Sequence, residues 1–191
     1  MVQLRISQNR PGLRFQNGRP ENVFETEGKK MLIRNATTED LHAISSVEAR
    51  CFPPEEAASE EAFAQRLNYY GNHFWLMFDD ERLIAFADGF VTDEADLTDR
   101  MYERADMHDE NGRWQMIFGV NTIPEYRNHG YAGELIRRII EDAKAQGRCG
   151  VVLTCKDKLV GYYAKFGFVN EGHTDKSCHG GVIWNQMRLT F

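Results

Sequence analysis

The chain lacks the features that mark a membrane protein, a disulfide-rich domain or a structural zinc site. No apolar run approaches the roughly 20 residues that cross a bilayer, and the N-terminus has no continuous apolar core of the kind a signal peptide carries. Its four cysteines form no C-x-x-C pair and have no histidine partner at metal-ligand spacing. We therefore expect a cytoplasmic protein with reduced thiols, no metal and no membrane contact.

Basic residues are also outnumbered by acidic ones. Lysine and arginine total 23 against 29 aspartates and glutamates, which gives a formal net charge of −6. This balance gives no electrostatic reason to expect a nucleic-acid partner, whereas a cationic substrate would meet a favourable field. With 191 residues, of which 42% are hydrophobic, the chain can bury one substantial core.

The first 30 residues differ in character from the rest. They are polar, with proline and glycine interspersed and only short alternating apolar stretches. We treat 1–30 as an N-terminal extension and 31–191 as one domain. The residues leave three states of the extension open, namely a hairpin, an arm packed against a neighbour, or disorder.

Hydrophobic periodicity predicts a mixed α/β fold for the domain. A short apolar alternation from Met31 leads through Thr37 or Thr38 as N-cap into a helix, and Ser59 caps a second helix. A hairpin is expected within 73–91 and a long central strand at 113–122. The stretch 92–112 between them is acidic and expected to be partly helical.

The second half predicts an alternation of helices and strands. A helix that follows the turn at 125–131 ends at Gly147, and a shorter helix starts with Asp157 as N-cap. Strands are expected at 149–155, 166–172 and 181–191. The whole order is strand, two helices, three strands, helix, strand, helix and two strands, built around one central sheet.

The stretch "EYRNHGYAGELIRR", residues 125–138, is the most informative local pattern. A strand that runs through a short loop into a helix presents unpaired amides and the positive end of the helix dipole, which together bind anions. Gly130 and Ala132 are small enough for a diphosphate to approach, and Arg127 can add a charged contact. The ATP-binding loop pattern GxxxxGK[ST] and the dinucleotide-binding pattern GxGxxG are both absent. The residues alone leave a phosphate site and an ordinary tight turn equally open.

Three segments resemble one superfamily. "RNHGYA" fits the R/Q-x-x-G-x-G/A motif of the Gcn5-related N-acetyltransferase (GNAT) superfamily, "IRNATTEDL" is similar to its first strand and helix, and "LVGYYAKFGF" to its late YxxxGF signature. The resemblance covers about 31–191. It implies a mixed, mostly antiparallel central sheet flanked by helices, with an acetyl-CoA cleft between the central strands. The segments 51–67, 83–94 and 179–187 look like the microbial arylalkylamine N-acetyltransferases.

The resemblance implies acetyl-CoA as co-substrate and assigns residues to it. The pantetheine arm would pair with the backbone of Val120, Asn121 and Thr122. The pyrophosphate would lie on the loop formed by Arg127, Asn128, His129, Gly130, Tyr131, Ala132 and Gly133. The amine would attack the thioester directly, so no acyl-cysteine is required.

Candidate catalytic groups follow from the same resemblance. Tyr163 occupies the family position near the coenzyme sulfur, where a phenol with a pKa of about 10 can donate to the departing thiolate; packing against the sheet is the alternative. Vertebrate serotonin-acetylating members carry two histidines where this chain has Met116 and Phe118. Another base is therefore needed. Glu55 is the candidate, and Glu56 is less favoured. The alternatives are that both are ordinary solvated acids at the start of a helix, and that water removes the proton.

The expected acceptor is a small-molecule amine. Phe52, Met116 and Phe118 suit an apolar or aromatic substrate tail, with core packing as the alternative, and His179 borders the pocket unless it is only a turn residue. The resemblance favours a small arylalkylamine or polyamine. Two alternatives stay open: a non-catalytic acyl-CoA-binding module, and a peptide or lysyl N-acetyltransferase. A homodimer is neither required nor excluded.

Overall fold

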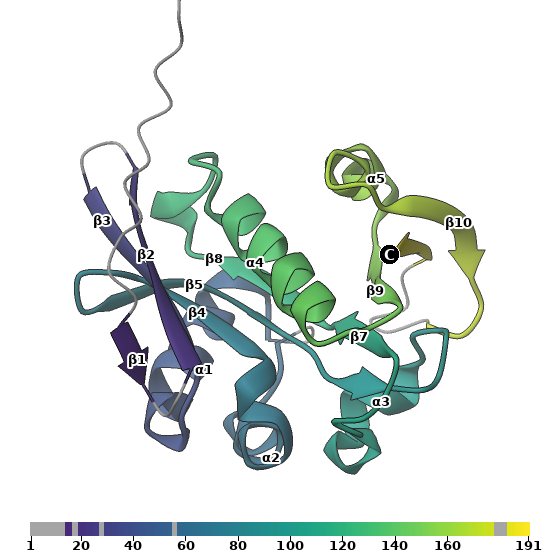
Figure 1. The fold of residues 1–191 in the computed structure, drawn as a ribbon, viewed down its shortest axis with the longest axis horizontal. Helices are drawn as coiled ribbons and strands as arrows, with labels where there is room; N and C mark the ends of the chain where they lie inside the picture. Colours follow the sequence, from purple (N-terminus) through teal and green to yellow (C-terminus); the bar gives the residue numbers. More distant parts are fainter. Residues whose placement is uncertain (1–13, 17–18, 27–28, 55–56, 178–182) are drawn as a thin grey trace, which may run out of the picture.

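The computed structural model describes residues 14–16, 19–26, 29–54, 57–177 and 183–191. These residues form two sheets with helices packed against them (Figure 1). The mixed α/β class and the predominance of antiparallel pairing agree with the sequence prediction.

The first sheet is antiparallel throughout and carries the N-terminal half of the chain. In spatial order its strands are β1 (Arg14–Gln16), β2 (Arg19–Thr26), β3 (Lys29–Asn35), β4 (Phe74–Asp79), β5 (Arg82–Asp88) and β8 (Gly119–Thr122). The described part of the N-terminal extension therefore contributes β1 and β2, and β2 pairs with β3 along the sheet.

The second sheet carries the C-terminal strands. In spatial order these are β10 (Val169–Thr174), β11 (Trp184–Thr190), β9 (Gly150–Cys155), β7 (Trp114–Ile117) and β6 (Val91–Thr92). Strands β7 and β9 are parallel, and the other pairs are antiparallel.

Five α-helices are present in the described part of the chain. They are α1 (Leu41–Cys51), α2 (Glu60–Tyr70), α3 (Asp99–Glu103), α4 (Tyr131–Ala145) and α5 (Asp157–Ala164). Helix α4 lies on one side of the strands of the first sheet, and α1 and α2 lie on the other (Figure 1). Within the described ranges, none of these helices is long and apolar enough to cross a membrane.

The helix boundaries follow the capping chemistry, with one correction. The Ser59 side chain accepts a hydrogen bond from the Ala62 amide at 3.2 Å, and Gly147 has a φ of +73° just beyond α4, both as predicted. Asp157, however, is the first residue of α5, and Lys156 holds the N-cap position. The Asp157 carboxylate instead accepts a hydrogen bond from Asn185 in β11 at 2.6 Å.

The expected long strand at 113–122 is broken, and the expected single sheet is two. β7 ends at Ile117 and pairs in the second sheet, whereas β8 starts at Gly119 and pairs with β5 in the first. The amide of Phe118, between them, donates to the Asp88 carbonyl at 2.8 Å. At this point the backbones approach so closely that a Cβ on Gly89 would lie 1.8 Å from the Met116 carbonyl oxygen. Only a glycine at position 89 permits this close approach beside the break.

Candidate active site

A cavity of about 650 Å³ opens where the two sheets part. Its walls come from α1, α2, the segment around α3, the break between β7 and β8, the end of β9, and α5. The lining residues are Glu48, Phe52, Ala57, Ala58, Ala62, Gln65, Arg66, Asp88, Asp99, Tyr102, Glu103, Ala105, Phe118, Gly119, Val120, Thr154, Lys156, Lys158, Leu159, Tyr163 and Trp184. Apolar and aromatic residues thus make up just over half of the lining, and seven of its 21 residues are charged.

Glu48 is the most unusual of these charged groups. It lies on the buried face of α1 with only 7% of its surface exposed. Its Oε1 accepts a hydrogen bond from the Ala58 amide at 3.1 Å, and its Oε2 accepts one from Asn121 Nδ2 at 2.8 Å. Burial raises the pKa of this carboxyl to about 7, and these two hydrogen bonds only partly oppose the rise. Near neutral pH it can therefore both accept and release a proton.

Sequence reasoning missed Glu48, although a signal was present. The apolar stripe predicted for this helix contains Ile44 and Val47, and Glu48 is four residues after Ile44 on the same face. A glutamate that continues a buried stripe is rarely buried without a specific partner. Its partner, Asn121, is far away in the sequence, so the pairing itself could not be predicted.

A buried ion pair lies beside Glu48. Arg66 Nη1 is 3.2 Å from Asp88 Oδ2, and the two side chains are only 10% and 3% exposed. A second nitrogen of Arg66, Nη2, donates to the Tyr102 carbonyl at 3.1 Å. The arginine thereby joins α2 to the end of β5 and to the segment around α3.

Tyr163 lies in the wall of the cavity, on α5. Its ring packs edge-on against Tyr162, with centroids 5.3 Å apart, and only 8% of the residue is exposed. Burial raises the pKa of its phenol above the usual value, so the hydroxyl keeps its proton at neutral pH. Both the expected role and the packing alternative are compatible with this position.

The loop before α4 has the backbone geometry of an anion site. Gly130 is the N-cap of α4 with a φ of +85°, and no side chain caps the helix among the described residues. A Cβ on Gly130 would meet no atom within 4 Å, so the space on that side of the glycine is open. Asn128 also has a positive φ, of 66°. Such a turn exposes amide groups at the positive end of the helix dipole.

The remaining side chains of this loop point in different directions. Arg127, Asn128 and His129 are exposed, whereas Tyr131 and Gly133 are buried and Ala132 is half-buried. The Nε of Arg127 donates to the Thr122 carbonyl at 3.0 Å, which ties the loop to the end of β8. A Cβ on Gly133 would lie 3.2 Å from the Phe166 ring, so that glycine permits the packing of α4 on the residues that follow α5.

Strand β8 has an edge available for a further strand. It is the last strand in the order of the first sheet, so within the described residues only its β5 side is paired. Val120 lines the cavity, whereas the Asn121 side chain is turned to Glu48. The edge and the cavity therefore meet at Val120.

The predicted substrate residues separate into three groups. Phe52 and Phe118 line the cavity. Met116 is fully buried in the core and is not among the lining residues, so for Met116 the packing alternative describes its position. Glu55, Glu56 and His179 lie outside the described residues, as does Cys178. The described cysteines, Cys51, Cys149 and Cys155, are free thiols.

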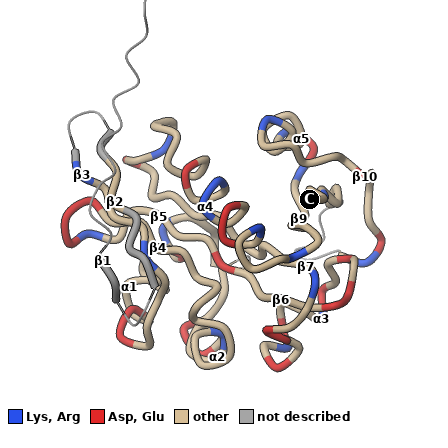
Figure 2. Tube along the Cα trace, in the orientation of Figure 1, with Lys and Arg blue, Asp and Glu red and all other residues tan. Residues whose placement is uncertain are grey.

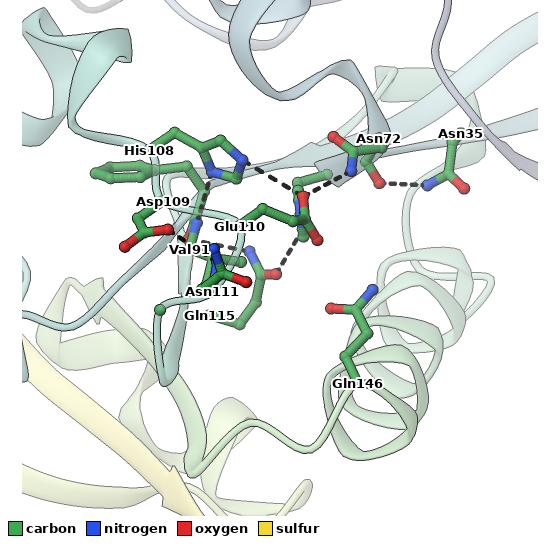
Figure 3. A network of polar contacts seen from close by, with 12 residues as sticks. Asn35, Asn72, Val91, His108, Asp109, Glu110, Asn111, Gln115 and Gln146 are labelled. Atoms are coloured by element: carbon green, nitrogen blue, oxygen red, sulfur yellow. Dashed lines mark hydrogen bonds and ion pairs between the residues drawn. The ribbon is translucent and has the colours of Figure 1, made fainter.

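The acidic stretch that follows β6 supplies a cavity wall that the sequence did not indicate. Acidic residues recur along this segment around α3 (Figure 2). Two of them, Asp99 and Glu103, line the cavity together with Tyr102 and Ala105. Further along the same segment, Glu110 lies at the centre of the polar network shown in Figure 3.

The Glu110 network consists of hydrogen bonds rather than of free metal ligands. His73, His108 and Glu110 each present an atom within 4.8 Å of the others. His108 Nδ1, however, accepts the Val91 amide at 3.2 Å, which places the ring proton of the neutral imidazole on Nε2, toward Glu110. Arg148 Nη2 lies 3.0 Å from Glu110 Oε1, and this positive charge opposes a bound cation.

His73 completes the network from the sheet side. Its Nδ1 is 2.8 Å from Gln115 Oε1, and its Nε2 is 3.1 Å from Glu110 Oε2. The Gln115 amide nitrogen donates to the Phe90 and Met116 carbonyls, so its oxygen must accept from His73. The hydrogen bond with His73, together with the one from Asn72, holds the pKa of Glu110 far below its usual range. The segment that follows α3 is thus anchored by an ionised carboxylate.

The raised pKa of Glu48 predicts a stability effect of Glu48→Gln. Since the unfolded pKa is near 4.5 and the folded value about 7, the protonated carboxyl stabilises the fold below about pH 4.5, and this contribution is lost as the pH rises through 7. The variant has no such loss. Urea unfolding should show its free energy of unfolding, relative to the native chain, rising by about 3 kcal/mol between pH 4.5 and 8.

Asp40→Asn is the control, because the fold lowers the pKa of Asp40 and raises that of Glu48. Burial opposes ionisation of Asp40, but the hydrogen bonds from Arg34 at 2.8 and 2.6 Å lower its pKa overall. Its contribution is present above the unfolded pKa and is lost as the pH falls through the folded value. The variant should therefore lose stability at neutral pH and recover toward the native value in acid. Parallel pH curves for the two variants would contradict the assigned burial of Glu48.

Comparison with known proteins places this architecture in a family. A family model described as "Acetyltransferase (GNAT) family" matches residues 41–168. Serotonin N-acetyltransferase from Mesocricetus auratus is 28% identical over 150 residues, which cover 66% of this chain and 70% of that protein. Glucosamine 6-phosphate N-acetyltransferase 1 from Oryza sativa subsp. japonica is 28% identical over 122 residues, covering 62% and 68%.

Solved structures agree with the family match at the level of the fold. The loading GNATL domain of CurA from Lyngbya majuscula has a TM-score of 0.71 at 15% identity, covering 84% of this chain and 97% of that one. The PaiA N-acetyltransferase from Thermoplasma acidophilum, in complex with coenzyme A, has a TM-score of 0.62 at 17% identity, covering 84% and 99%. The chain belongs to the acetyltransferase (GNAT) family and is an acetyltransferase.

Proposed function

We propose that this acetyltransferase transfers the acetyl group of acetyl-CoA to the primary amine of a small arylalkylamine. The observation that carries the proposal is the buried Glu48 carboxyl in a cavity that Tyr163 also lines. The aromatic lining from Phe52, Phe118 and Trp184 favours an aromatic body over a polyamine. The two relatives are named as N-acetyltransferases of serotonin and of glucosamine 6-phosphate, and these names support an amine acceptor.

The proposed acetyl-CoA site uses backbone groups. The open edge of β8 at Val120, Asn121 and Thr122 suits an extended pantetheine arm, which can pair as a further strand. The uncapped start of α4, behind Gly130, suits a pyrophosphate because amides and the helix dipole meet there. Arg127 lies beside this turn and adds positive charge. The thioester supplies the activated acetyl group.

Glu48 is proposed as the proton acceptor. Met116 and Phe118 stand where the vertebrate serotonin-acetylating members have histidines, and Glu55, the candidate from the sequence, lies outside the described residues. A free alkylammonium has a pKa near that of lysine, about 10, and must lose a proton before its nitrogen can attack. Glu48 lines the cavity, is held by Ala58 and Asn121, and has a pKa of about 7. A buried carboxylate of that strength takes the proton within the pH range in which the enzyme is expected to work.

Tyr163 is proposed as the proton donor to the departing thiolate. Its hydroxyl stays protonated because burial raises its pKa. Tyr163 lies on α5 and the acceptor Glu48 on α1, so the donor and the acceptor come from different helices that line the same cavity. Two groups with different proton affinities in one cavity suit a reaction that removes one proton and returns another.

The proposed function is tested by release of free thiol from acetyl-CoA over an amine panel. Tryptamine and phenethylamine should give the highest kcat/KM, spermidine less, and a peptide with a free N-terminus least. Glu48→Gln should lower kcat/KM by roughly 100-fold or more without changing coenzyme A affinity. Glu39→Gln, an exposed acid just before α1, should leave both unchanged.

The outcomes of the panel separate the alternatives. Turnover on peptides but not on small amines would point to a peptide or lysyl acetyltransferase. Coenzyme A binding without thiol release from any amine would point to a non-catalytic module. Either result contradicts the proposal, as does full activity of Glu48→Gln.

Tyr163→Phe removes the proposed proton donor and keeps the ring. Turnover on the best amine should fall at least about tenfold, with little change in coenzyme A affinity. Tyr162→Phe, at the neighbouring half-buried ring, is the matched control and should keep its turnover. Equal rates for the two variants would remove Tyr163 from the mechanism.

Gly130→Val tests the pyrophosphate site. The added side chain would occupy the open space before α4, and coenzyme A affinity measured by calorimetry should fall by about tenfold or more. Gly147→Val, at the other end of α4, has the same left-handed φ and equally open surroundings. It matches the backbone strain of the first variant. Equal affinities would count against the site.

A further inference from the structure

The ion pair between Arg66 and Asp88 has no assigned role in the proposed chemistry, yet it lies in the cavity wall next to Glu48. The two residues come from separate elements, α2 and the last position of β5. Burying such a pair is costly compared with apolar packing, so its presence calls for a functional explanation.

The position of Asp88 is set by the break between the two sheets. Asp88 is opposite Gly119 in the pairing of β5 with β8. A Cβ on Gly119 would lie 3.1 Å from Asp88 Oδ1 and 3.6 Å from Asn121 Nδ2. The same Asn121 nitrogen donates to Glu48. Asp88 Oδ1 and the Glu48–Asn121 hydrogen bond thus border one small space that Gly119 leaves open.

Arg66 holds Asp88 from the other side. Its Nη1 contacts Asp88 Oδ2, so the arginine engages the oxygen that faces away from Gly119. Its guanidinium also lies over the Phe118 ring, at 5.8 Å from the centroid. Burial raises the pKa of Asp88, and the Arg66 guanidinium, which keeps its proton in proteins, opposes that rise and favours the carboxylate.

We propose that Asp88, held by Arg66, is a positioning residue for the proton transfer at Glu48: its negative charge makes Glu48 a stronger proton acceptor, and Arg66 limits that effect. The inference rests on the proposed role of Glu48. Like charges in a shared low-dielectric site disfavour one another's ionised form, which strengthens the hold of Glu48 on the amine's proton. Asp88 itself need not touch the substrate.

Few other charged or titratable groups act on Glu48. Asp88 raises the pKa of Glu48 and Arg66 lowers it, with Asp88 the stronger of the two. From β8 the Asn121 amide is uncharged, and on α1 the Cys51 thiol has a pKa raised by burial. Asp88 is therefore the carboxylate best placed to set the pH at which Glu48 works.

The test is the pH dependence of kcat/KM for the best amine. The acid limb of that profile reports the ionisation of the proton acceptor in the free enzyme. Asp88→Asn keeps a hydrogen-bond acceptor for Arg66 and removes the negative charge, so the acid limb should move to lower pH by on the order of one unit. Arg66→Lys is the matched control, because it disturbs the same pair and keeps both charges. Its acid limb should stay in place.

A second variant covers the case in which Asp88→Asn does not fold. The neutral pair Asp88→Asn/Arg66→Gln contains no unpaired buried charge. Its acid limb should also move to lower pH, but by less, because the smaller opposing effect of Arg66 is removed as well. An acid limb that is unmoved or raised in the variants that lack Asp88 overturns the inference. So does an equal shift in Arg66→Lys, which would indicate a purely structural role.

Glu48→Gln, measured in parallel, distinguishes the proposed role of Glu48 from the proposed influence of Asp88. If this variant retains its activity and acid limb, the proposed role of Glu48 is wrong, and the inference falls with it. If Glu48→Gln abolishes the acid limb and Asp88→Asn leaves it in place, only the inference about Asp88 is wrong.

Discussion

The burial of the Glu48 carboxyl at the parting of the two sheets is the constraint on which the rest of the site depends. The sheets part at Phe118, between β7 and β8, where Gly89 permits the close approach of two backbones. That interruption frees the edge of β8, opens the cavity and directs Asn121 to Glu48. One local distortion thereby creates both the proposed coenzyme edge and the proposed proton acceptor.

The burial of Glu48 lowers the stability of the fold at neutral pH, and it also gives the carboxyl the pKa that the proposed proton transfer uses. A carboxyl with a pKa of about 7 is costly to ionise in the folded state, and an ordinary core would place an apolar residue there. The chain retains it beside a second buried charge pair, Arg66 with Asp88. Buried ionisable side chains that lower the stability of the fold are concentrated in functional sites, where they are retained because the reaction needs them. The anchored wall around α3 then encloses the cavity from the side of the second sheet.

Local patterns in the sequence predicted the main helices, most of the strands, and the caps at Ser59 and Gly147, because each depends on neighbouring residues. The anion-binding role of the turn at Gly130 stays a prediction. The break at Phe118 could not be predicted, since residues 113–122 form one apolar pattern, and the close approach of Gly89 to Met116 at the break comes from another strand region. Glu48 was missed for a similar reason, because its burial depends on Asn121 from a distant strand. The acidic stretch around α3 was recognised, but not its place in the cavity wall.

The most direct measurement of the central claim is an NMR titration of the Glu48 side-chain carboxyl in the free enzyme, with Glu48→Gln to assign the signal. The account predicts a midpoint near pH 7, well separated from the exposed glutamates. A midpoint in the ordinary range of glutamate, about 4.3, would contradict it. In that case the carboxyl is solvated, and both its proposed role and the influence of Asp88 on it are lost.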